Sequence, residues 1–140
     1  MNTVDTLSQD CVEYIPIPAE FETLAKRAHE LIRQIAGDDA GDEWKQVLVF
    51  QTEDDQIHEA IILVDKSGLH ADERLLQTIG AESAVIRLVC CWSSGELDMP
   101  MYDFRQKLCH LNSRNRDAEM LLIGDRRFLV KPIKATMPKE

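Results

Sequence analysis

The feature of the sequence that most constrains the fold is a nearly continuous apolar run at residues 84–92, which only Arg87 interrupts. A strand that is apolar on both faces is typical of a sheet covered by helices on both sides. The connections before and after this run, residues 65–83 and 93–119, are each long enough to hold a crossover helix. We therefore expect residues 84–92 to form the central strand of an α/β sheet.

Hydrophobic periodicity and turn residues predict the other elements. Helices are expected at residues 18–37, 71–79 and 100–111, and further strands at residues 44–52, 57–64, 120–123 and 128–133. The order α-β-β-α-β-α-β-β predicts a single α/β domain with three helices and a five-stranded mixed sheet. In it the second, third and fourth strands run parallel, and an antiparallel hairpin partner lies at either side. An α+β two-layer sandwich, with helices on one face only, is the alternative.

Two segments are expected to lie outside this domain. Residues 1–17 are predicted to form an extended N-terminal arm, because Pro16 and Pro18 each bias the preceding residue away from helix. Residues 134–140 are predicted to be a polar C-terminal tail, which leaves residues 18–133 as the globular domain.

Composition excludes several classes of protein. With 140 residues, of which 44% are hydrophobic, the chain is too short for two full domains and too apolar for general disorder. No apolar run reaches the roughly 18–20 residues that cross a bilayer, and the first residues do not resemble a signal peptide. Cys11, Cys90, Cys91 and Cys109 do not resemble a secreted disulfide framework. We expect a cytoplasmic protein with reduced thiols and no membrane partner.

Charge is unevenly distributed along the chain. Residues 1–60 hold 14 acidic and 4 basic side chains, within a formal net charge of -9. The bases of the second half include Arg105, Lys107, Arg114, Arg116, Arg126 and Arg127. Net negative charge opposes binding to a phosphate backbone, so nucleic acid is an unexpected partner unless these bases share one face.

The candidate ligand site is the loop that follows the central strand. In open parallel sheets, ligands bind beyond the carboxyl ends of the strands. The side chains offered there are Cys91, Trp92, Ser93, Ser94, Glu96 and Asp98. The alternative is an ordinary loop in which Asp98 or Asp103 serves the start of the next helix. If a thiol reacts at this site, we expect Cys91 at the strand end to react faster than Cys90.

No motif for a metal or cofactor is found, so neither is expected. Cys90 and Cys91 are neighbours on a strand and point to opposite faces, which prevents joint chelation of one ion. The four histidines are scattered. His29 shares the polar side of the first helix with Glu22 and Lys26, which we interpret as a solvated face.

The main functional hypothesis from these features is a non-enzymatic protein-binding or regulatory module that acts as a homo-oligomer. The charge polarity, the N-terminal arm and the strand edges favour it. The first alternative is a small ligand-binding protein or enzyme with its site at residues 91–98. The second is a nucleic-acid-binding protein that uses the basic C-terminal part.

Overall fold

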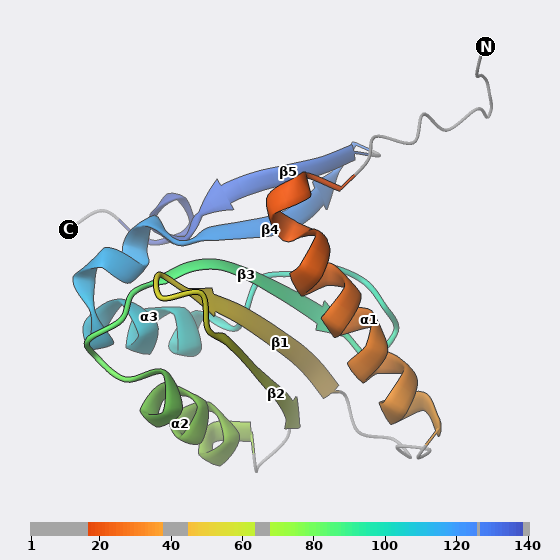
Figure 1. Cartoon of the computed structure of the whole chain (residues 1–140), viewed down its shortest axis with the longest axis horizontal. Helices are drawn as coiled ribbons and strands as arrows, with labels where there is room; N and C mark the ends of the chain where they lie inside the picture. The colour runs from red at the N-terminus through yellow and green to blue at the C-terminus, as the bar shows by residue number, and fades with distance from the viewer. Residues whose placement is uncertain (1–16, 38–44, 64–67, 126, 139–140) are drawn as a thin grey trace.

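The fold follows the predicted order of elements. The computed structural model describes residues 17–37, 45–63, 68–125 and 127–138 (Figure 1). The helices are α1 (Glu22–Gly37), α2 (Gly68–Ile79) and α3 (Tyr102–Leu111). The strands are β1 (Lys45–Thr52), β2 (Ile57–Leu63), β3 (Val85–Trp92), β4 (Glu119–Gly124) and β5 (Arg127–Pro132). Short 3-10 helices span Ala19–Phe21, Ser113–Asp117 and Ile133–Thr136.

The five strands form one mixed sheet in the order β2-β1-β3-β4-β5. Strand β1 is antiparallel to both β2 and β3, whereas β3 is parallel to β4 and β4 is antiparallel to β5. Strands β2, β3 and β4 therefore share one direction, and β3 is central, as predicted. The expected place of β1 was wrong, because β1 lies between β2 and β3 and not at the side of the sheet.

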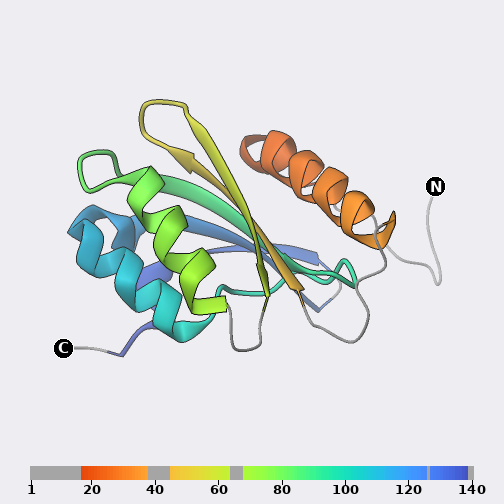
Figure 2. The same cartoon turned by 90° about the horizontal axis from the view of Figure 1, so that it is seen from below.

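Helices cover both faces of the sheet, so the two-layer alternative is wrong. Helix α1 crosses one face, while α2 and α3 lie side by side on the other (Figure 2). The alternation of side chains along β1 separates the two cores: Val47 and Val49 pack with α1, whereas Leu48 and Phe50 pack on the side of α2 and α3. The same alternation places Cys90 and Cys91 of β3 on opposite faces, as expected.

Strands β3 and β4 pair only briefly. Their register includes only Arg87 with Glu119 and Leu88 with Met120. Beyond this point β4 and β5 diverge from β3, as Figure 1 shows near the start of α1. The chain that leaves β3 folds back along its free edge, where the Asp98 N–H donates to the Cys90 carbonyl at 2.9 Å. This divergence leaves space between the two strands on the α1 side.

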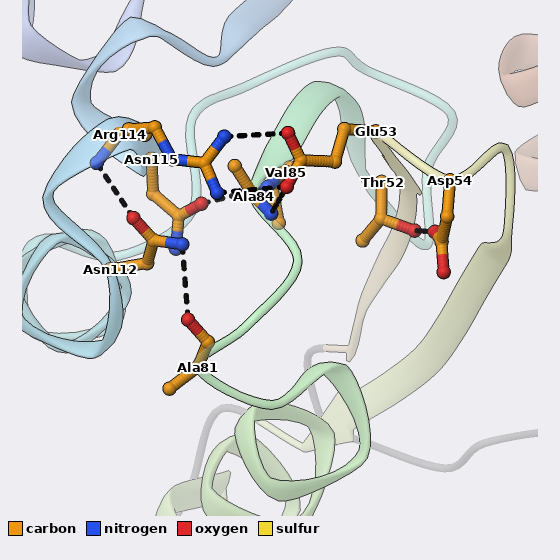
Figure 3. Close-up of polar contacts among 9 residues, drawn as sticks. All are labelled: Thr52, Glu53, Asp54, Ala81, Ala84, Val85, Asn112, Arg114 and Asn115. Carbon is orange, nitrogen blue, oxygen red and sulfur yellow. Dashed lines mark hydrogen bonds and ion pairs between the residues drawn. The ribbon is translucent and has the colours of Figure 1, made fainter.

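A polar corner holds the opposite end of β3 (Figure 3). Asn115 is fully buried; its Oδ1 accepts from the Val85 N–H at 2.7 Å, and its Nδ2 donates to the Leu108 carbonyl at 2.8 Å. The Glu53 carboxylate accepts from the Ala84 N–H at 3.0 Å and also pairs with Arg114. The 3-10 helix Ser113–Asp117, which precedes β4, thus anchors the start of β3. Among the described helices, none is long and apolar enough to span a bilayer.

Candidate functional site

A cleft opens where β3 and β4 diverge beneath α1. It has a volume of about 1020 Å³. Its apolar surface comes from β3, β4, β5 and α1, through Val89, Cys91, Leu121, Phe128 and Ile32. Surface pockets that hold small ligands are commonly about 300–1,000 Å³ with mainly apolar walls and a few polar groups. The cleft has the size and composition of such a pocket.

Charged side chains surround the apolar floor. Helix α1 contributes Glu22, Lys26 and His29, which fall on one side of the helix because they are four and three residues apart. Glu96 and Asp98 face them from the segment after β3. Within the described residues, the side chains of Glu22, Lys26, His29 and Glu96 have no hydrogen-bond or ion-pair partner.

The segment after β3 has a defined shape. The Gly95 N–H donates to the Trp92 carbonyl at 2.8 Å, and Gly95 has a φ of +98°, which favours glycine. Asp98 closes the segment, because its Oδ2 accepts from Trp92 Nε1 at 2.8 Å and its Oδ1 accepts from the Met99 N–H at 2.7 Å. The wall of the cleft formed by residues 92–98 is thus held by hydrogen bonds in the protein itself.

The structure divides the residues expected at the site. Cys91, Trp92, Glu96 and Asp98 line the cleft, while Ser93 and Ser94 lie in the turn and are not part of its lining. Sequence reasoning missed the contribution of α1 and of β4 and β5. The polar side of α1 looked like an ordinary solvated face, and its position over the end of β3 depends on tertiary packing.

Cys91 is buried at the floor of the cleft. Burial away from water raises the pKa of its thiol to about 11, because the thiolate would lose its hydration. The thiol is therefore protonated at neutral pH and lacks the activation that a nucleophilic cysteine needs.

Two of the basic residues of the second half make contacts within the fold. Arg105 is buried, with 8% of its surface exposed, and binds backbone carbonyls. Arg114 is paired with Glu53. Arg126 lies outside the described residues. Arg105 and Arg114 both belong to the set of bases that the nucleic-acid-binding alternative would use.

The two residues directly before α3 are apolar. Pro100 and Met101 precede the helix, and Met101 is 48% exposed. Phe104 in the first turn is 1% exposed, and its ring centroid lies 5.6 Å from that of Phe50 on β1.

The described residues include no group of three or more His, Cys, Asp or Glu side chains placed to hold a metal ion.

No protein-family model and no curated protein sequence matches the chain. Solved structures do match. The cytidine deaminase from Mycobacterium leprae has a TM-score of 0.63 and 15% identity, over 87% of this chain and 100% of that chain. The cytidine deaminase from Mycobacterium tuberculosis has a TM-score of 0.59 and 15% identity, over 86% of this chain and 96% of that one. The enzyme from Burkholderia pseudomallei has a TM-score of 0.59 and 13% identity, over 87% and 98% of the two chains.

This likeness corrects the main functional hypothesis. A non-enzymatic protein-binding module was expected, but the backbone has the fold of an enzyme class. The features behind that hypothesis were the charge distribution, the expected N-terminal arm and the strand edges, and none of them determines the path of the backbone. Residues 1–16 of the expected arm lie outside the described residues. The alternative, a ligand site near residues 91–98, agrees better with the fold.

Zinc-dependent deaminases carry the signature H-x-E followed by P-C-x-x-C, whose His or Cys and two Cys residues bind zinc and whose Glu transfers protons. The corresponding order in this chain is His70-Ala71-Asp72 and then Pro100-Met101-Tyr102-Asp103-Phe104. The proline and a histidine are present, but both thiolate positions are apolar and the acid is aspartate. These residues do not fit a zinc centre of that kind. The chain therefore has the fold of the cytidine deaminases without their zinc-binding residue pattern.

Proposed function

We propose that the protein binds a small heteroaromatic molecule of nucleoside size in the cleft between α1 and the diverging strands β3 and β4. The observation that carries this proposal is the cleft itself. It has a volume of about 1020 Å³ and an apolar floor, and charged side chains without partners among the described residues surround that floor. Free charged groups around an apolar surface can orient a ligand whose body is apolar and whose edge is polar.

The nucleoside-like class is supported by two features. The solved structures with this fold are cytidine deaminases, which act on a nucleoside, although the residues that correspond to the zinc signature lie on the other face of the sheet in this chain. The cleft also offers Trp92 and Phe128, two aromatic side chains against which a flat ring can pack. Glu22, Lys26, His29 and Glu96 supply both acceptors and donors for the polar edge.

Nuclear magnetic resonance titration tests this proposal. Isotopically labelled protein is titrated with cytidine, uridine and adenosine, and backbone amide shifts are followed. We expect saturable shifts for at least one nucleoside, concentrated at residues 22–32 and 91–98. Absence of saturable shifts for all three at millimolar concentration would exclude this ligand class.

A matched pair of variants locates the binding. Ala25 faces the cleft, whereas Thr23 is exposed elsewhere on α1. Ala25→Tyr should fill the cleft and abolish the shifts, while Thr23→Tyr should bind as the wild type does. Circular dichroism of both variants checks that α1 still forms. Equal binding by the two variants would place the ligand elsewhere.

Three further expectations remain proposals. Self-association is supported by exposed apolar side chains on β4 and β5, namely Ile123, Leu129 and Val130, and native mass spectrometry measures it. A cytoplasmic location rests on the cysteine pattern, and cell fractionation tests it. The domain boundaries at residues 18 and 133 are tested by limited proteolysis.

A further inference from the structure

We infer that the end of the fold where α2 and α3 begin is a metal-free structural junction, in which a buried phenylalanine and a buried arginine hold the helix start. This inference concerns the face of the sheet opposite the proposed ligand cleft and does not depend on the proposed function. Its basis is the disagreement between the fold, which is similar to that of cytidine deaminases, and the side chains present here, which lack the signature of zinc-dependent deaminases.

The first observation is the loss of both thiolate positions. Zinc sites in proteins take sulfur from cysteine thiolates, nitrogen from histidine and oxygen from carboxylates. Met101 offers only a thioether and is 48% exposed, and Phe104 offers no donor atom at all. Phe104 is instead 1% exposed and packs in the same core as Phe50, Leu108 and Cys90. The position at which the signature P-C-x-x-C would place its second thiolate is thus part of the hydrophobic core.

The second observation is a set of contacts that fixes the start of α3 without a metal. Arg105 is 8% exposed, and its Nε donates to the Pro100 carbonyl at 2.9 Å. Its Nη1 donates to the Thr136 carbonyl at 3.1 Å and to Thr136 Oγ1 at 2.6 Å. The guanidinium also lies 5.5 Å from the centre of the Tyr102 ring. One side chain therefore joins the preceding loop, the helix and the C-terminal 3-10 helix.

The other described cysteines do not restore a thiolate site. Cys90 and Cys91 lie on opposite faces of β3, so they cannot reach one ion together. Cys109 follows Phe104 by five residues on α3, packs against the core on the α2 and α3 side, and lies in no cluster of metal-ligating side chains among the described residues.

Metal analysis of the wild-type protein is the direct test. Untagged protein is produced in zinc-supplemented medium and desalted, and zinc is measured by inductively coupled plasma mass spectrometry. The thermal midpoint Tm is then measured with and without EDTA. We expect zinc far below one ion per chain and an unchanged Tm. One zinc per chain, or a Tm that falls when EDTA is added, would overturn the inference.

The role assigned to Arg105 has its own variant and control. Arg105→Met keeps the length of the side chain but leaves the Pro100 and Thr136 acceptors without their donor, so Tm should fall by about 5–10 °C. Lys107→Met removes a cation from the same helix at a partly exposed position and should change Tm little. An equal effect of the two substitutions would show that Arg105 does not hold the junction.

Discussion

Trp92 and Asp98 are joined across the turn that follows the central strand, with Trp92 Nε1 donating to Asp98 Oδ2 at 2.8 Å. The second oxygen of the same carboxylate accepts from the Met99 N–H. Asp98 therefore fixes both ends of the segment that forms one wall of the cleft. From the sequence, Asp98 was expected to be either a ligand group or a helix cap. In the structure its carboxylate shapes the site through these two hydrogen bonds.

Asp98→Ala should loosen this wall. Two hydrogen bonds to a partly exposed carboxylate are lost, so the free energy of unfolding should fall by about 1–2 kcal/mol. Amide hydrogen exchange of residues 92–98 should accelerate, while exchange in α2 stays unchanged. Asp98→Asn is the control, since its amide oxygen can still accept one of the two bonds. Unaltered exchange in Asp98→Ala would show that the carboxylate does not hold the segment.

Asn115→Ala should destabilise the fold strongly for a single polar substitution. It leaves the Val85 N–H buried without its acceptor and leaves the Leu108 carbonyl with only the longer bond from the Asn112 N–H, which should lower the free energy of unfolding by roughly 2–4 kcal/mol. Asn112→Ala is a matched control, because Asn112 makes its two hydrogen bonds at an exposed position. Urea denaturation of the two variants compares them. Similar losses would contradict the importance assigned to burial.

Cys91 should resist alkylation at neutral pH. Burial raises the pKa of its thiol to about 11, so the reactive thiolate is scarce at pH 7 and should increase as the pH approaches that value. Iodoacetamide labelling followed by peptide mass spectrometry measures each cysteine separately. The partly exposed Cys109 serves as internal comparison and should be labelled sooner. Rapid labelling of Cys91 in folded protein at pH 7 would contradict its protonated, buried state.

The ion pair between Glu53 and Arg114 should make stability depend on pH. The hydrogen bond from Arg114, and then that from the Ala84 N–H, lower the pKa of the Glu53 carboxyl below its ordinary value of 4.5. The unfolded chain therefore takes up a proton at a higher pH than the folded chain. The stabilisation is present above about pH 4.5 and is lost as the pH falls through the pKa of the folded state.

Arg114→Gln tests this relationship. The Tm difference between wild type and variant should be larger at pH 7 than at pH 3, and high salt at pH 7 should reduce it because the pair is exposed. Lys134→Gln removes the partner of Asp117 and serves as the comparison variant. It breaks an exposed ion pair that is held by a single contact. A Tm difference that is the same at both pH values would mean that the charges of Glu53 and Arg114 do not contribute to stability.

Local pattern determined the elements of this protein. The apolar spacing of Phe21, Leu24, Ala28, Leu31 and Ile35 predicts α1, and the unbroken apolar run predicts β3, because each pattern matches the period at which that element buries side chains. The same alternation correctly separated Cys90 from Cys91. Fold class and element order thus followed from the sequence.

Only the tertiary structure decided which elements are neighbours. The apolar pattern of β1 shows that this strand is buried. The same pattern fits a strand that lies between β2 and β3 and a strand that lies at the edge of the sheet. The cleft depends on the early end of pairing between β3 and β4, and on α1 lying across the gap. For this reason Lys26 and His29 could not be assigned to a site from sequence, although they line the same cleft as Glu96 and Asp98. The packing that places these residues around one cleft joins distant parts of the sequence, and a hydrophobic period carries no information about it.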